Sequence, residues 1–182
     1  MKEIIELLKS GGTILYPTDT VWGLGCDATN EDACQKILAI KKRPEHKSFV
    51  ILVDDFPMLQ RYIPDFQEVC YDLADLAVKP LTIIYPNAKD LAPSILAGDG
   101  SVGIRITKDP TCIKLIRGLR KPIVSTSANI SGDKNPVNYE TISVEIKNGA
   151  DYIVKERLTE KMTTPSQIIK IGLSGDIEII RK

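Results

Sequence analysis

The chain alternates between segments whose apolar residues recur every three or four positions and shorter segments that are apolar almost throughout. The first kind predicts amphipathic helices and the second predicts buried strands, because helices and strands repeat with periods of 3.6 and 2 residues. Helices are predicted from the amino terminus to the glycines at 11 and 12, and at 31–43, 66–77, 110–120 and 139–147. Strands are predicted at 13–17, 48–53, 81–86, 102–107, 122–126, 152–155, 166–171 and 177–181.

This order of elements predicts an α/β fold, with a twisted mixed β-sheet flanked by helices. The sequence contains no internal repeat, low-complexity tract or evident linker, so residues 1–182 are predicted to form one domain. Ligands of such sheets bind in a crevice beyond the strand ends. Polar residues and glycines that directly follow predicted strands are therefore candidates for a ligand site.

Composition narrows the class of protein. The chain is 43% hydrophobic and 26% charged, which is typical of soluble globular proteins. No apolar run approaches the roughly 20 residues that span a bilayer, and the amino terminus lacks a signal-peptide core; a cytoplasmic location is expected. The formal net charge is zero, which argues against broad electrostatic binding of nucleic acid but not against a local basic pocket.

Cysteine and histidine offer little catalytic chemistry. The four cysteines form no C-x-x-C pair, so we expect reduced, mostly buried thiols and no protein metal site: Cys26, Cys34, Cys70 and Cys112. The single histidine, His46, lies between Glu45 and Lys47 in a charged stretch, which favours a solvated loop over an acid–base role.

Two polar stretches follow predicted strands directly. In STSANISG (125–132), Ser125, Ser127 and Asn129 alternate and share one face if the chain stays extended. Their hydroxyl and amide groups can bind phosphate oxygens or a small polar ligand. In YPTDTVWGLGCDAT (16–29), polar residues precede two glycines that permit close backbone approach. Both stretches also contain turn-forming residues, so ordinary turns are the alternative.

Two cationic positions are more specific. Lys41 continues the apolar face of the helix predicted at 31–43, and Pro44 disfavours helical geometry at Arg43, so both cations can turn toward a crevice. The alternative is that they only complement the dipole at the helix end. Alternation within 101–106 places Arg105 on the same face as Ser101 and Gly103. A surface ion pair is the alternative for Arg105.

Four blocks in order resemble a known family. YPTDTVWGLGCDA (16–28), KKRP (41–44), SVGIRI (101–106) and STSANISG (125–132) look like the YrdC/TsaC family of threonylcarbamoyl-AMP synthases. The resemblance extends from about Gly11 to the carboxyl terminus. Its two strongest markers are the K-x-R of Lys41 and Arg43 and the S-x-N of Ser127 and Asn129. A related YciO type shares the proline-threonine loop but lacks both motifs intact, which favours the synthase.

The resemblance implies a YrdC-like fold with a central ligand crevice and a nucleotidyltransferase reaction. L-Threonine, bicarbonate or CO2, and ATP with Mg²⁺ give threonylcarbamoyl-adenylate and pyrophosphate. Separate transfer proteins then pass the threonylcarbamoyl group to an adenosine beside the anticodon of certain tRNAs. Matched position by position, threonine is contacted by Thr20, Arg43, Arg105, Ser125 and Ser166. ATP is contacted by Lys41, Lys47, Ser101, Ser127, Asn135 and Arg181, with Asn129 shaping the loop.

The same resemblance assigns catalysis to Lys41 and Arg43, which would neutralise the charge that develops as pyrophosphate leaves. Three segments depart from the family pattern. AVKPLT (77–82) replaces a tryptophan-proline-glycine-proline run, Trp22 replaces a tyrosine or phenylalanine, and TTPSQI (163–168) matches loosely around Ser166. Two other functions stay open: a module that binds tRNA or double-stranded RNA, and a relative that handles carbamoyl-adenylate.

Overall fold

The structure is a computed structural model that describes residues 1–42 and 49–182. Its helices are α1 (Lys2–Lys9), α2 (Glu31–Lys41), α3 (Phe56–Tyr62), α4 (Val69–Leu76), α5 (Pro110–Leu119) and α6 (Val144–Gly149), with one 3-10 turn, η1 (Pro93–Ile95). Its strands are β1 (Ile14–Tyr16), β2 (Gly23–Gly25), β3 (Val50–Val53), β4 (Leu81–Tyr85), β5 (Val102–Ile106), β6 (Ile123–Val124), β7 (Thr126–Ser127), β8 (Tyr152–Ile153), β9 (Gln167–Ile171) and β10 (Ile177–Arg181).

The strands form two mixed sheets. The smaller sheet has the order β7-β2-β1-β8, and the larger has the order β10-β9-β4-β5-β3-β6. The predicted α/β class with mixed strands is confirmed, but the strands divide between two sheets where one was expected. The strand predicted at 122–126 explains the division. It breaks at Ser125, whose N–H bonds to the Val50 oxygen at 2.8 Å, so that its two halves join different sheets.

The remaining differences from the predicted elements have local causes. Helix α2 starts after its predicted cap, Asn30, but ends at Lys41 because Lys42 adopts a left-handed conformation with φ 49°. Helix α6 begins only after Ser143, which caps it, so the segment 139–143 is not helical. Strand β2 (sequence GLG) was missed because its glycines hide the apolar pattern. Helix α3 was missed as well, although Asp55 caps it.

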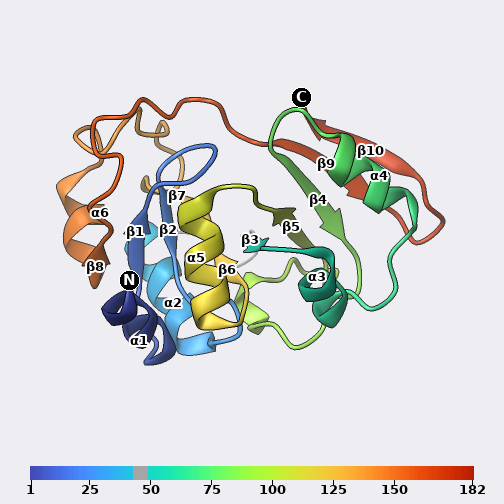
Figure 1. The fold of residues 1–182 in the computed structure, drawn as a ribbon, viewed down its shortest axis with the longest axis horizontal. Coiled ribbons are helices and arrows are strands. Elements are labelled where there is room, and N and C mark those ends of the chain that lie inside the picture. Colours follow the sequence, from blue (N-terminus) through green and yellow to red (C-terminus); the bar gives the residue numbers. More distant parts are fainter. Residues whose placement is uncertain (43–48) are drawn as a thin grey trace.

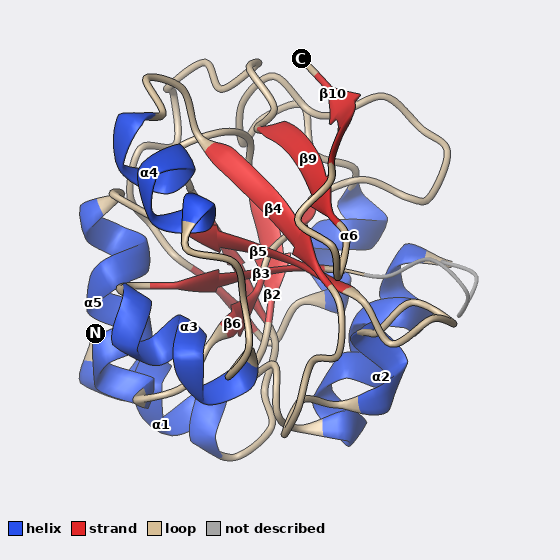
Figure 2. Ribbon diagram, turned by 90° about the vertical axis from the view of Figure 1, so that its right-hand side faces the viewer, coloured by secondary structure: helices blue, strands red, loops and turns tan. Residues whose placement is uncertain are grey.

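Figures 1 and 2 show how the layers are arranged. In Figure 1, the smaller sheet lies on the left with α1, α2, α5 and α6. The long strands β4, β9 and β10 lie on the right with α3 and α4. The main core packs helices against both sheets, and a second cluster lies beside α6: Leu15, Trp22, Ala128, Ile142, Ile146 and Met162. Within the described ranges, no helix has the length and apolar content that a membrane span requires.

Candidate functional site

A polar cavity of about 300 Å³ lies where the chain passes from one sheet to the other. Its walls come from Gly23 and Ser127 in the smaller sheet and from Val50, Ile84 and Gly103 in the larger sheet. Val50 and Ile84 pair with Gly103 from the two sides of β5, so the three residues share one face. A side chain at Gly103 would meet Thr82 Cγ2 at 3.2 Å, so the glycine keeps this floor open.

Arg105 is the buried cation of this cavity, with a side chain only 5% exposed. Its Nη2 lies 3.0 Å from Asp19 Oδ1, an ion pair that lacks hydrogen-bond geometry, and it donates to Thr20 Oγ1 at 3.3 Å. The Nε of Arg105 is buried without a hydrogen-bond partner among the described residues. Since an unsatisfied buried donor is costly, this group is suited to bind a ligand acceptor.

A second cation reaches the cavity from β10. Arg181 donates from Nε to the Ser166 backbone oxygen at 2.8 Å and from Nη2 to Ser166 Oγ at 3.2 Å. Ser166 Oγ also shares a 2.8 Å hydrogen bond with Thr82 Oγ1, on the neighbouring strand β4. Burial lowers the pKa of Arg181, and the positive charge of Arg105 lowers it further. The two guanidinium groups therefore favour an anion in the cavity.

A β-bulge aims Arg181 at the cavity. Strand β10 pairs with β9 as Ile179 with Ile169 and then Arg181 with Ile168, so β10 carries one extra residue, Ile180. Ile168 lines the cavity, and the bulge turns Arg181 toward the same face. Without the bulge, strict alternation would place Arg181 on the opposite face, beside Ile179.

Lys41 links the two strongest sequence motifs. Its side chain is buried, and its Nζ donates to the backbone oxygen of Ser127 and, at 2.6 Å, to that of Asn129. Its own backbone oxygen accepts from the N–H of Ser131 at 2.8 Å. Lys41 is therefore not an exposed cation that only complements the dipole of α2. Lys41 fixes the loop that follows β7, which is the loop of the S-x-N motif.

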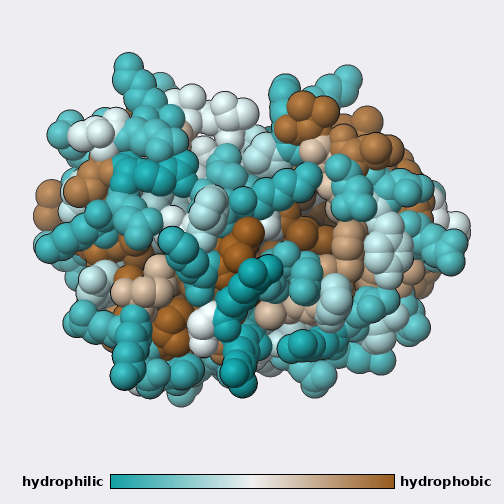
Figure 3. All heavy atoms as spheres, viewed as in Figure 1, coloured by the Kyte–Doolittle hydropathy of each residue, from teal (hydrophilic) through white to brown (hydrophobic). Residues whose placement is uncertain are grey.

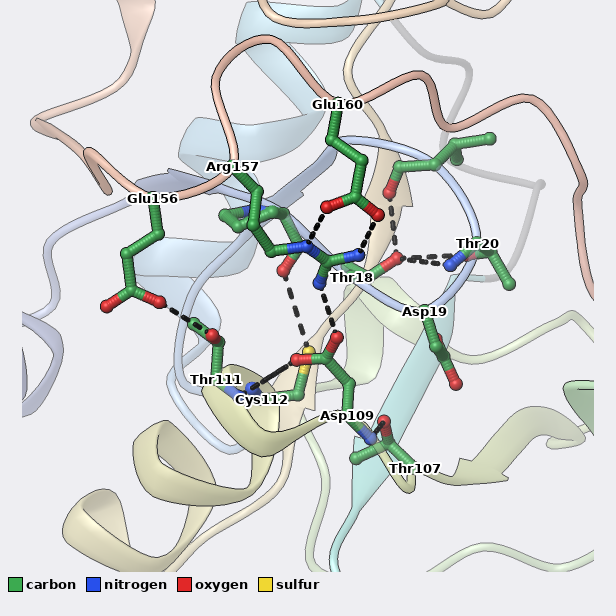
Figure 4. A network of polar contacts seen from close by, with 12 residues as sticks. Thr18, Asp19, Thr20, Thr107, Asp109, Thr111, Cys112, Glu156, Arg157 and Glu160 are labelled. Carbon is green, nitrogen blue, oxygen red and sulfur yellow. Dashed lines mark hydrogen bonds and ion pairs between the residues drawn. The ribbon is translucent and has the colours of Figure 1, made fainter.

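An ion-pair network lies next to the loop of Thr18, Asp19 and Thr20 (Figure 4). Asp109 caps helix α5 by accepting from two backbone N–H groups, and its other oxygen accepts from Arg157 Nη1 at 2.6 Å. Arg157 also binds Glu160 through two hydrogen bonds, and these carboxylates raise its pKa. The network attaches the segment that leads to Ser166 to the amino-terminal end of α5, next to this loop.

Comparison with known proteins places the chain in a family. The family model Sua5_yciO_yrdC, described as telomere recombination, matches residues 6–182. The chain belongs to the Sua5/YciO/YrdC family. A relative from Pseudoalteromonas translucida, named threonylcarbamoyl-AMP synthase, is 34% identical over 95% of this chain and 93% of its own length. One of the same name from Photobacterium profundum is 36% identical over 72% of this chain and 73% of its own length.

Solved structures of family members share the fold. P. abyssi Sua5 complexed with L-threonine superposes with a TM-score of 0.84 at 26% identity, over 93% of this chain. This chain spans about half (50%) of that Sua5 chain. E. coli YciO superposes with a TM-score of 0.82 at 23% identity, over 100% of this chain and 87% of its own. At this lower identity, the likeness to YciO shows the fold alone.

The structure brings most of the family-matched residues together. Seven of them line the cavity: Thr20, Arg105, Ser125, Ser127, Asn135, Ser166 and Arg181. Lys41 and Asn129 are not among the described lining residues. The Asn129 amide donates to the oxygens of Ile130 and Asp133 and so shapes the turn. The predicted roles of Arg43 and Lys47 fall on residues outside the described ranges, as does that of His46.

Ser101 is likewise absent from the described cavity lining. Its hydroxyl donates to Asp99 Oδ1 at 2.5 Å, and Lys170 pairs with the other Asp99 oxygen at 3.1 Å. The Ser101 hydrogen bonds and then Lys170 lower the pKa of Asp99 to about 2. Ser101 thus belongs to an ionic cluster next to β5 rather than to the cavity wall.

Two polar residues at the site received no individual role from the sequence. Thr82 is fully buried and lines the cavity, but an isolated threonine in a predicted strand gives no signal. Asp19 lies inside the loop that was predicted to meet a ligand, and its spacing one residue before Thr20 was the available signal. The four cysteines are free and buried, as expected. Within residues 1–42 and 49–182, no group of three or more His, Cys, Asp and Glu could hold a metal ion.

Proposed function

We propose that this protein is a threonylcarbamoyl-AMP synthase, which joins L-threonine, bicarbonate or CO2, and ATP into threonylcarbamoyl-adenylate and pyrophosphate. The relatives of that name, at 34% and 36% identity, support this activity, as does the Sua5 structure complexed with L-threonine. The single observation that carries the proposal is the convergence of Arg105, Arg181 and several hydroxyl groups on one cavity. Such a set fits an amino acid and a phosphate side by side.

The amino-acid end is assigned to Arg105 and its neighbours. The unpartnered Nε of Arg105 would donate to the threonine carboxylate, as guanidinium groups commonly do. Thr20 and Ser125 also line the cavity, and their hydroxyls would bind the threonine hydroxyl. The nucleotide end is assigned to Arg181, Ser127 and Asn135, where the positive charge of Arg181 favours phosphate.

The chemistry requires positioning rather than a covalent nucleophile. A carbamate oxygen formed on threonine attacks the α-phosphorus of ATP, and pyrophosphate leaves. Two anions must therefore be held together, which the positive charges of Arg105 and Arg181 in the cavity lining favour. The described lining of the cavity contains no carboxylate. Mg²⁺, a hard cation that prefers oxygen ligands, would therefore enter as the Mg–ATP substrate.

The product indicates the partners. Threonylcarbamoyl-adenylate is an activated acyl group, so separate transfer proteins would carry it to tRNA, and a cytoplasmic location would fit that route. A net charge of zero gives no support to RNA binding by this chain itself. HypF chains share the fold at 21% identity, a likeness that carries no activity to this chain.

Amino-acid preference tests the proposal. Pyrophosphate release is measured with ATP, bicarbonate and either threonine, serine or valine. Serine lacks only a methyl group and should lose roughly 10-fold in kcat/KM, whereas valine lacks the hydroxyl and should lose roughly 10⁴-fold, because it leaves buried polar groups unpaired. Equal turnover of valine and threonine would overturn the assignment.

A further inference from the structure

The exposed apolar residues of this protein gather in one place, away from the cavity. Of ten large hydrophobic side chains exposed in the described part of the chain, seven lie on α4, just after it, or on the β9–β10 hairpin. We call these seven the apolar patch: Val69, Leu76, Val78, Leu173, Ile177, Ile179 and Ile180. In Figure 3, hydrophobic atoms gather over the region where Figure 1 places β10 and α4.

Three residues of the apolar patch, Val69, Leu76 and Ile179, line a groove of about 370 Å³ between α4 and β10. Leu81 and Ile169 form its floor, and Leu76 and Ile179 stand on its two walls. Strand β10 is the edge of the larger sheet, and all five of its residues are exposed. Contiguous exposed apolar surface of this kind marks a contact with another macromolecule.

The groove is distinct from the polar cavity because it lies on the other face of the same strands. Thr82 and Ile168 line the cavity, whereas their neighbours Leu81 and Ile169 line the groove. Of all the lining residues, only Arg181 is shared by both. The groove lining is mainly aliphatic, with Asp72, Arg181 and Lys182 as its charged residues, so it fits a protein surface better than a polar metabolite.

We propose that this groove is an interface between two copies of this chain, related by a two-fold axis that runs along the groove. Such an axis sets the α4 wall of each copy against the β10 wall of the other. The two walls carry opposite charges: Asp72 lies on α4, and Lys182 lies at the end of β10. Each Asp72 therefore faces a Lys182 of the second copy, twice in the dimer.

The apolar residues are self-complementary in the same arrangement. Leu76 and Val78 project beside the groove and are 79% and 99% exposed. The two-fold axis brings them over β10 of the other copy, where Ile179 is 61% exposed. The patch thus contains both the projecting side chains and the groove that would receive them, which is the requirement for an interface between identical surfaces.

The first test measures mass in solution. Sedimentation velocity of the full chain from roughly 1 to 200 µM should show a dimer that dissociates on dilution, a range typical of modest interfaces. Leu76→Asp should produce a monomer throughout this range. The control is Val144→Asp, which introduces the same charge at an apolar residue of α6 that is 69% exposed and outside the patch. It should leave the dimer unchanged.

The second test examines the two-fold arrangement by exchanging charges. Asp72→Lys and Lys182→Asp should each weaken the dimer by roughly 10-fold in Kd, because each creates two like-charge contacts. The double variant should recover the wild-type Kd. A wild-type protein that stays monomeric would overturn the proposal and leave the groove to a different protein. A dimer that survives Leu76→Asp, or a charge exchange that is not rescued, would also overturn it.

Discussion

The two faces of β4, β9 and β10 line two different surfaces, a polar cavity and an apolar groove. One face carries the buried Thr82 and, together with Arg105 of the neighbouring strand β5, encloses a cavity. The other face carries apolar side chains in solvent and opens into a groove. Globular proteins expose some apolar atoms everywhere, so the informative deviations are a buried charge and a concentrated apolar surface. Here one sheet shows both deviations, back to back, which indicates two separate binding surfaces.

The first change removes the positive charge of Arg105 from the cavity. Arg105→Met should lower kcat/KM by about 10³-fold, because it removes a group placed for electrostatic binding. It should also lower the free energy of unfolding by about 3–5 kcal/mol, since it leaves Asp19 without its buried ion-pair partner. Kinetics and urea unfolding measure the two effects.

A double variant separates catalysis from folding at this pair. Asp19→Asn combined with Arg105→Met removes both charges and should recover most of the stability without recovering the activity. If the double variant regained both, Arg105 would be only a structural partner of Asp19.

The second change removes the ammonium group of Lys41, which binds the loop after β7. Lys41→Met should lower the rate by about 100-fold or more. It should also loosen the loop after β7, because the backbone oxygens of Ser127 and Asn129 lose their donor. The backbone oxygen of Trp22, the only tryptophan, accepts a hydrogen bond from the N–H of Ala128 in this loop. The fluorescence of Trp22 should therefore shift.

The matched control is the next residue. Lys42 is 64% exposed on its side chain and pairs with Glu145 at 2.8 Å. Lys42→Met removes the same charge at the same helix end and should leave both rate and fluorescence near wild type. Similar losses in the two variants would contradict a specific role for Lys41.

The third change removes one hydroxyl group, that of Thr82, from the cavity face. Thr82→Val keeps the volume but removes the hydroxyl that bonds to Ser166. The KM for threonine should rise about 10-fold, as a hydrogen bond that orients a ligand group is lost. Thr82→Ser retains the hydroxyl and should restore the KM. An unchanged KM in Thr82→Val would show that Ser166 needs no positioning from β4.

The smallest expected effect concerns Asp99. Its pKa is about 2, below the usual value, so its ionised form stabilises the folded state above about pH 4, and this contribution is lost as the pH falls toward 2. Because its side chain is 56% exposed, Asp99→Asn should lower the free energy of unfolding at pH 7 by only a few tenths of a kcal/mol. Urea unfolding between pH 7 and 3 should show the difference shrinking below pH 4.

The sequence predicted the positions of the long elements and several polar residues of the cavity lining, because both follow from local patterns. Apolar periodicity marks α2 and α5, and polar residues after strands mark Thr20 and Ser125. The residues matched by family resemblance extended the set to Ser166 and Arg181. What could not be predicted depends on contacts between distant segments.

Three examples show this limit. The split of one predicted strand at Ser125 depends on Val50, far away in the sequence. Arg181 faces the cavity only because of a bulge at Ile180, against the alternation of its strand. Lys41 continues an apolar helix face, as predicted, but its bonds to the loop after β7 arise from the packing of α2 against that loop.

Direct detection of the product tests the central claim, that the polar cavity joins an amino acid to a nucleotide. The protein is mixed with Mg–ATP, L-threonine and bicarbonate in CO2-depleted buffer, with each reactant omitted in turn, and threonylcarbamoyl-adenylate is measured by mass spectrometry. The account predicts adenylate and an equal amount of pyrophosphate only in the complete mixture. No adenylate from folded protein with all three reactants, or pyrophosphate release that does not depend on threonine, would contradict it.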